Sequence, residues 1–208
     1  MITITNILDC EKFLAGVDAV IFDLDDTLYS EVDYVRSGYR AVAAVFPDVE
    51  RMAEKLWAAF EQRMPAIDVV LRAEGKDTAE NKALALEAYR GHIPNIDLYP
   101  GVRELLVRLK TQRKLGLITD GRPEGQRAKL GALELEGCFD KVIITDELGG
   151  VQYRKPNETA FRRMSCELDV PFERMVYIGD NTSKDFLAPQ ALGMMAIYFK
   201  NPNGLYVR

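Results

Sequence analysis

The sequence predicts an α/β fold in which a parallel sheet is sandwiched by helices and a small helical segment is inserted after the first strand. Two observations support this prediction. Short, continuously apolar runs alternate with helical patterns in the second half of the chain, which is typical of strand–helix–strand units with right-handed crossovers. A gap of about ninety residues, too long for one crossover helix, separates the first two apolar runs.

Five apolar runs are predicted to be strands, at residues 19–23, 115–119, 141–145, 175–179 and 195–199. Continuous apolarity, without alternating polar residues, favours strands that are buried on both faces of a parallel sheet. Helical spacing occurs between them, in Val102, Leu105, Leu106 and Leu109 after Pro100, in Phe161, Met164 and Leu168 after Asn157, and in residues 187–192 before Gly193. These patterns predict helices with a cap at the start or a glycine at the end.

The gap between the first two strands predicts a separate helical domain. Its apolar stripes are Val32, Val35, Tyr39 and Val42, then Val49, Met52, Leu56 and Phe60, then residues 67–74 before Gly75. The run Asp77-Thr-Ala-Glu80 resembles a capping box that opens a fourth helix. We therefore divide the chain into a core domain of residues 1–29 and 98–208 and a helical domain of residues 30–97.

The composition disfavours several classes of protein. The chain has 208 residues, 48% hydrophobic and 28% charged, and a net charge of −5, which is ordinary for a globular protein and offers no excess of basic groups for nucleic acid. The sequence lacks a long apolar run and a signal-peptide pattern, so we predict a cytoplasmic protein that does not bind membranes. Three separated cysteines and the single histidine, His92, disfavour a disulfide scaffold, a zinc module and a histidine-dependent triad.

Acidic residues follow two of the predicted strands directly. Asp23, Asp25 and Asp26 come after the first strand, and Asp180 and Asp185 come after the fourth. The carboxyl ends of parallel strands meet at the edge of the sheet where ligands bind. Carboxylates gathered there raise one another's pKa unless a cation compensates them, and Mg²⁺ prefers carboxylates, waters and phosphate oxygens. This arrangement predicts a metal site.

The ends of the other strands carry groups that suit an anion. Thr119-Asp-Gly121 offers a hydroxyl and a flexible backbone at the end of the second strand, and Arg154-Lys155-Pro156 brings a cation after the third. Carboxylates for a metal, a hydroxyl, backbone donors and a lysine are the groups that phosphoryl transfer needs.

The ordered set Asp23-Leu-Asp-Asp-Thr-Leu28, Thr119-Asp-Gly121, Lys155-Pro156 and Gly179-Asp180 through Asp185 resembles the four motifs of the haloacid dehalogenase-like (HAD) hydrolase superfamily. The resemblance extends from about residue 19 to residue 199 and implies a Rossmann-like core with helices on both faces of the sheet. A helical insertion between the first two motifs is similar to the α-helical cap of the subfamily that contains many small-molecule phosphatases.

The resemblance implies a role for each motif residue. Asp23 would be the nucleophile that forms an aspartyl-phosphate, and Asp25 would be the acid and base. Thr119 and Lys155 would bind the phosphoryl oxygens, with Asp120, Gly121 and Arg122 also on the substrate side. Mg²⁺ would be held by Asp23, the backbone carbonyl of Asp25 and Asp180. Asp185 would orient Lys155 or a metal-bound water, or would itself be a metal ligand, and the sequence does not separate these roles. Tyr29, Arg36 and Arg122 are further candidates to meet the leaving group.

Three features depart from the family pattern. Asp120 stands where the family often has Asn, which adds negative charge near the site. The approach to Lys155 is longer than usual, and the chain ends within ten residues of the fifth strand. An uncovered sheet edge or helix face there would be available to a second chain, so the sequence leaves a monomer and a homodimer open.

A Mg²⁺-dependent phosphatase acting on a small phosphorylated metabolite is the function that the sequence favours. A phosphomutase would use the same nucleophile and return the phosphate before water attacks. A haloacid dehalogenase fits less well, because an acid at Asp25 and a metal ligand at Asp180 serve phosphate departure. A binding protein without activity would not need the nucleophile.

Overall fold

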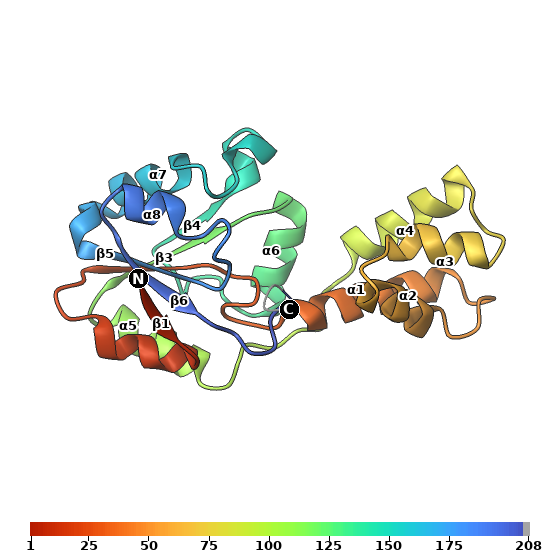
Figure 1. Ribbon diagram of the computed structural model, residues 1–208, viewed down its shortest axis with the longest axis horizontal. Coiled ribbons are helices and arrows are strands. Elements are labelled where there is room, and N and C mark those ends of the chain that lie inside the picture. The colour runs from red at the N-terminus through yellow and green to blue at the C-terminus, as the bar shows by residue number, and fades with distance from the viewer. Residues whose placement is uncertain (206–208) are drawn as a thin grey trace. The chain divides into compact units, whose positions relative to one another are not determined.

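The computed structural model describes residues 1–205, which form two compact units. One unit contains Met1–Glu31 and the described residues from Asp97 onward, and the other is Val32–Ile96. Figure 1 labels the elements of both units. Within residues 1–205, no helix has the length and apolar character needed to cross a membrane.

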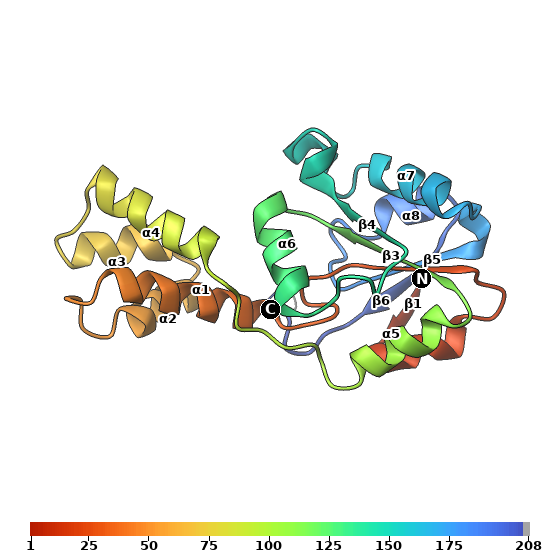
Figure 2. The ribbon, with the colours of Figure 1, turned by 180° about the vertical axis from the view of Figure 1, so that it is seen from behind.

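The larger unit is built on one six-stranded parallel sheet (Figures 1 and 2). Its strands are β1 (Ile2–Ile4), β2 (Ala19–Phe22), β3 (Lys114–Thr119), β4 (Lys141–Ile144), β5 (Met175–Gly179) and β6 (Met195–Phe199). They lie in the order β1-β6-β5-β2-β3-β4. The predicted α/β, Rossmann-like fold class is confirmed, since every neighbouring pair of strands is parallel.

Strand β1 was not predicted, and it changes one expectation. It pairs with β6 in the register Ile2↔Ile197 to Ile4↔Phe199. Only three residues long, with Ile4 alone fully buried, β1 is too short for a periodic pattern to indicate it. The edge of the last strand is therefore paired with the chain's own N-terminal segment, and β1 becomes the outermost strand on that side of the sheet.

Helices cover both faces of the sheet. Helix α5 (Val102–Lys110) and the 3-10 helix η1 (Ile7–Phe13) lie on one face, and α7 (Thr159–Leu168) and α8 (Leu187–Ala191) lie on the other (Figures 1 and 2). The α7 face contains a continuous apolar core, in which the ring of Phe161 packs edge-on against Tyr177 at 5.1 Å between centroids. The α5 side is closed by Leu105, Leu106 and Leu109, all buried as their helical spacing predicted.

Helix α6 (Pro123–Ala132) follows β3, and the sequence offered no apolar stripe for it. Its buried face holds Gln126 and Lys129 beside a single large apolar side chain, Leu130. A buried face made mostly of polar residues gives no apolar stripe in the sequence. Three further 3-10 helices complete the unit: η2 (Thr145–Leu148), η3 (Val151–Tyr153) and η4 (Phe172–Arg174).

The smaller unit consists of α1 (Glu31–Val45), α2 (Met52–Glu61), α3 (Ala66–Ala73) and α4 (Ala79–Gly91), except that the first residue of α1, Glu31, belongs to the larger unit. Its apolar stripes form a core of their own around Val42, Leu56 and Leu71. The N-cap of α4 is Thr78, whose hydroxyl accepts a hydrogen bond from the Asn81 N–H at 3.1 Å. The predicted capping box was thus shifted by one residue.

Candidate active site

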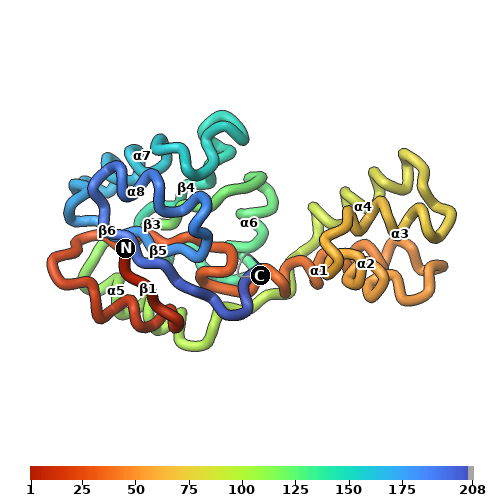
Figure 3. The backbone as a smooth tube through the Cα atoms, in the orientation of Figure 1, coloured from red at the N-terminus to blue at the C-terminus, as the bar shows by residue number. Residues whose placement is uncertain are grey.

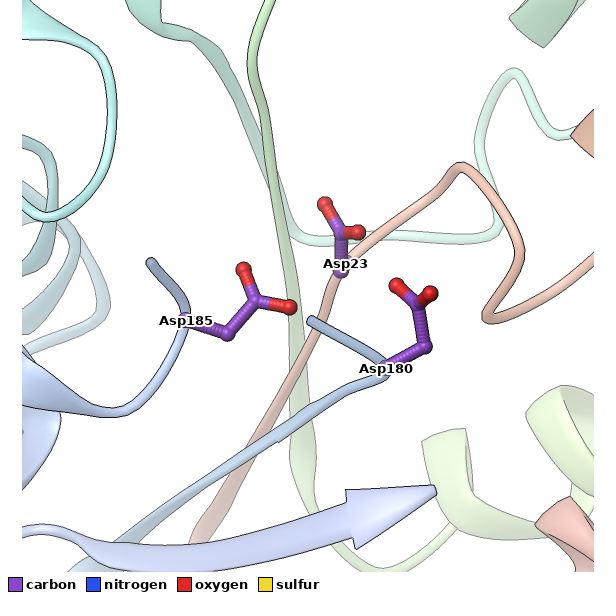
Figure 4. A group of neighbouring side chains, drawn as sticks. All are labelled: Asp23, Asp180 and Asp185. Carbon is purple, nitrogen blue, oxygen red and sulfur yellow. The ribbon is translucent and has the colours of Figure 1, made fainter. Parts of the chain in front are cut away.

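Three of the predicted acidic residues come together at the carboxyl edge of the sheet. Asp23 follows β2, and Asp180 and Asp185 follow β5, the strand beside it. Each contributes one carboxylate oxygen to a group in which these oxygens lie within 4.8 Å of one another. Figure 4 shows the three side chains reaching this place from separate segments. The order of the strands therefore creates the acidic cluster.

Lys155 connects two of these carboxylates. Its Nζ lies 2.5 Å from Oδ1 of Asp23 and 2.8 Å from Oδ1 of Asp185, and it donates to the Tyr177 hydroxyl at 2.8 Å. Its side chain is 0% exposed. Burial alone would lower the pKa of Lys155, but the charges of Asp185 and Asp23 raise it above the ordinary value. The residue is therefore an ammonium group that holds both carboxylates in place.

Asp180 has no such partner. Its Oδ2 atom is buried and has no hydrogen-bond partner in the described part of the chain. Burial, with the nearby charges of Asp23 and Asp185, raises the pKa of Asp180 to about 9. Burial also raises the pKa of Asp23 to about 7, against the opposing charge of Lys155. A buried group of three carboxylates, one with an oxygen that has no hydrogen-bond partner, has an excess of negative charge that a bound divalent cation would compensate.

Asp25 points into a different environment. Lys129 Nζ lies 2.6 Å from its Oδ1, Gln126 Nε2 donates to its Oδ2 at 3.1 Å, and the Tyr29 hydroxyl also donates to Oδ1. Burial alone would raise the pKa of Asp25, but Lys129 and the other donors lower it. The Asp25 side chain is therefore not part of the acidic cluster, and the metal role predicted for its backbone carbonyl stays a prediction.

Strand β3 ends at Thr119, and the loop after it supplies Asp120 and Gly121. The Thr119 hydroxyl oxygen is buried and has no hydrogen-bond partner among residues 1–205. The Asp120 carboxylate, by contrast, accepts from Thr145 Oγ1 at 2.9 Å, from the Lys155 N–H at 3.0 Å and from Lys184 Nζ at 3.2 Å. Its additional charge is thus used within the protein, where it ties this loop to the Lys155 segment.

The remaining candidates lie at varied positions. Gly121 has a φ of 139°, and a Cβ there would lie 2.7 Å from Gln126 Nε2, so glycine is required in this turn. Arg122 is exposed at the N-cap of α6. Tyr29 is fully buried, and its contact with Asp25 makes it part of the site wall. Arg36 belongs to the helical unit, where its guanidinium stacks 4.3 Å from the Trp57 ring centre.

Comparisons with known proteins decide the family. A family model described as haloacid dehalogenase-like hydrolase matches residues 20–199. The chain belongs to this family. The resemblance seen in the motifs is thereby confirmed.

Curated relatives and a solved structure agree with this assignment. The glyceraldehyde 3-phosphate phosphatases of Methanothermobacter thermautotrophicus and Methanopyrus kandleri are 31% and 29% identical to the chain. These alignments cover 86% and 87% of the chain and 84% and 83% of the relatives. A HAD-superfamily hydrolase structure from Geobacter sulfurreducens superposes with a TM-score of 0.67 at 19% identity, covering 90% of this chain and 89% of that one.

Several residues around the hydrolase site were not found from the sequence. Tyr177 lies inside an apolar strand, where it has the pattern of a core aromatic. Gln126 and Lys129 lie on a helix without an apolar stripe, more than 100 residues from Asp25. The segment after β6 is drawn as a blue tube in Figure 3. In this segment, Asn201 donates from Nδ2 to the Asp26 carbonyl at 2.8 Å. All four make contacts that only the fold creates.

Gly179 provides a test of how tightly the cluster is packed. A Cβ on this residue would lie 2.5 Å from Oδ2 of Asp185 and 2.9 Å from its Cγ. We expect Gly179→Ala to lower the free energy of unfolding by about 1–3 kcal/mol, because the buried carboxylate must move. Gly131→Ala in α6 is the control, since a Cβ there would meet open space in the described part of the chain, and it should be neutral or stabilising. Urea unfolding of both variants measures the difference, and equal stabilities would contradict the prediction.

Proposed function

We propose that this hydrolase is a Mg²⁺-dependent phosphatase that hydrolyses a small phosphorylated metabolite through an aspartyl-phosphate on Asp23. The observation that carries the proposal is a buried Asp23 carboxylate placed between the Lys155 ammonium and Asp180, with the orphaned Thr119 hydroxyl oxygen on the next strand. This combination supplies a nucleophile, donors for phosphoryl oxygens and carboxylate ligands for a cation. The phosphatase names of the curated relatives support the same reaction.

The chemistry of the chain's own residues has two steps. A carboxylate oxygen of Asp23 attacks phosphorus and forms the aspartyl-phosphate, while the bond from phosphorus to the ester oxygen breaks. Asp25, which must enter this step in its protonated form, gives its proton to the leaving alkoxide and becomes a carboxylate. Water then attacks the aspartyl-phosphate, and Asp25 accepts its proton. The products are the alcohol and inorganic phosphate, and both carboxyl groups return to their first state.

Thr119 and Lys155 are proposed to bind the phosphoryl oxygens. The Thr119 hydroxyl has no other polar partner in the part of the chain that is described, and the Lys155 ammonium already lies against the nucleophile. Asp120 is better suited to positioning than to substrate contact, since its carboxylate accepts from the Lys155 backbone. Asp185 is proposed to orient Lys155, in line with their 2.8 Å separation.

The metal proposed for this site is Mg²⁺, held by Asp23, Asp180 and the backbone carbonyl of Asp25. The clustered carboxylates, with the orphaned oxygen of Asp180, fit a hard cation that prefers oxygen ligands. When bound, Mg²⁺ would neutralise charge on the phosphoryl oxygens and reduce their repulsion from the nucleophile. Asp185 is paired with Lys155, which favours an indirect role for its carboxylate.

The substrate is proposed to be a small phosphate ester such as a triose phosphate, because two of the relatives are named for glyceraldehyde 3-phosphate. We propose that the helical unit, Val32–Ile96, acts as the cap that selects the leaving group. A monomer and a homodimer both stay open, because β1 pairs with β6 and is itself the outermost strand of the sheet. The predicted cytoplasmic location and the absence of nucleic-acid binding stay predictions.

The test is a screen for inorganic phosphate release from D-glyceraldehyde 3-phosphate, sugar phosphates, phosphoserine and nucleotides. We expect release in the presence of Mg²⁺ and its loss in excess EDTA, with recovery when Mg²⁺ is added back. The melting temperature should also rise with Mg²⁺, because a ligand that binds only the native state stabilises it.

Other outcomes of this screen would contradict the proposal. Phosphate release that EDTA does not change would remove the metal from the mechanism. Phosphate that is returned to the substrate through a bisphosphate would indicate a phosphomutase, and release of halide from a 2-haloacid would indicate a dehalogenase.

A further inference from the structure

Helix α6 places two polar residues in the interior beside the proposed acid and base. Gln126 and Lys129 are 4% and 5% exposed. Lysine is rarely buried to this extent unless its charge is used. The two residues lie three positions apart, so they project from the same face of the helix. Their contacts show what this face does.

Both oxygens of Asp25 receive a donor from α6. Lys129 Nζ lies 2.6 Å from Oδ1, and Gln126 Nε2 lies 3.1 Å from Oδ2. The same Gln126 nitrogen donates to the Asp120 carbonyl at 2.6 Å. Because both neighbours are acceptors, the orientation of the Gln126 amide is determined by its surroundings. A carboxylate held at both oxygens cannot turn about its side-chain bonds without breaking a hydrogen bond.

These contacts connect Asp25 to Lys155, the residue proposed to bind the phosphoryl oxygens. Gln126 joins Asp25 to the Asp120 carbonyl, and the Asp120 carboxylate accepts from the Lys155 N–H at 3.0 Å. The loop that carries Lys155 and the carboxylate of Asp25 are thus fixed to one helix. Proton transfer requires the acid or base to lie within hydrogen-bond distance of the reacting oxygen. A displacement of the Asp25 carboxylate by about 1 Å is therefore expected to lower the rate.

We propose that Lys129, together with Gln126, is a positioning residue that acts through Asp25 and sets the place of its carboxylate for both proton transfers. This inference rests on the proposed function. Lys129 is not a substrate ligand in this arrangement, since its ammonium group is directed to Asp25 and its side chain is 6% exposed. Its effect on the reaction should therefore exist only when Asp25 is present.

A double-mutant cycle tests this dependence. The variants are Asp25→Asn, Lys129→Met and the combination of both, with para-nitrophenyl phosphate and Mg²⁺ as the probe. We expect Lys129→Met alone to lower kcat about tenfold or more with KM changed less than about twofold, because a positioning residue acts on the chemical step. In the Asp25→Asn background, Lys129→Met should change kcat less than about threefold, since coupled residues are not additive.

Arg127→Met is the matched control on the same helix. Arg127 is 66% exposed at its side chain and pairs with Glu147, away from Asp25. We expect this variant to keep the kcat of the wild type within about twofold, as exposed ion pairs contribute little. Circular dichroism melts of every variant separate loss of fold from loss of rate.

Each outcome decides the inference. An equal loss from Lys129→Met with and without Asp25, or a raised KM at unchanged kcat, would overturn it. If Lys129→Met alone does not fold, the comparison between Asp25→Asn and the double variant decides, because neither keeps a buried Asp25 charge. A wild type that releases no phosphate contradicts the proposed function itself, whereas an active wild type with a full-rate Lys129→Met contradicts only the role of Lys129.

Discussion

Asp23→Asn is expected to lower the rate of phosphate release on the order of 10⁴-fold or more, the size of loss seen when an enzyme loses its covalent nucleophile. The amide has nearly the same shape as the carboxylate but cannot form a stable bond to phosphorus in the same step. Lys155 keeps its contact with Asp185 at 2.8 Å, so the site retains a partner for the buried ammonium. Initial rates of phosphate release under saturating Mg²⁺ measure the effect.

Asp18→Asn is the matched control for this variant. Asp18 directly precedes β2, at the opposite end of the strand from Asp23, and its side chain is 45% exposed in a pair with Arg174. The same chemical change there should leave the rate unaltered. Equal rates for wild type and Asp23→Asn would show that the nucleophile lies elsewhere. Radiolabelled phosphate trapped on the acid-denatured wild type, and missing from Asp23→Asn, would identify the covalent intermediate directly.

The sequence predicted the strands that are long and apolar. Strands β2 to β6 were found because each contains a continuous apolar run. Strand β1 was missed because pairing with β6, and not its own pattern, defines its three residues. The buried face of helix α6 was not found, because it carries Gln126 and Lys129. Local patterns therefore predict elements that bury apolar surface and miss those that bury polar groups.

The proximity of the acidic residues could also be predicted, for a topological reason. Asp23 and Asp180 directly follow neighbouring parallel strands, so their positions at one edge require only the strand order. The partners of Asp25 could not be found in this way. Lys129 reaches Asp25 from 104 residues away along the chain, and this contact depends on the rotation of α6 about its axis. For the same reason, the sequence could not show that the Asp120 carboxylate accepts a hydrogen bond from the Lys155 backbone N–H.

Lys155→Met should affect both activity and stability. Its ammonium contacts Asp23 and Asp185 with a side chain that is 0% exposed. Removing one partner of a buried ion pair typically costs about 3–5 kcal/mol, because the remaining charge stays buried without compensation. Loss of a preorganised donor to the phosphoryl group should also lower kcat about 10²- to 10³-fold. Urea unfolding and phosphate-release rates measure the two effects separately.

Lys141→Met separates these effects from the loss of any lysine. Lys141 begins β4, and its 27% exposed side chain pairs with Glu167. A partly exposed pair of this kind contributes up to about 1 kcal/mol, so this variant should stay close to the wild type in both measurements. If Lys155→Met is as stable as Lys141→Met, the Lys155 ammonium does not hold the cluster together. If it is less stable but equally active when Mg²⁺ saturates the site, Lys155 stabilises the carboxylates and another group must bind the phosphoryl oxygens.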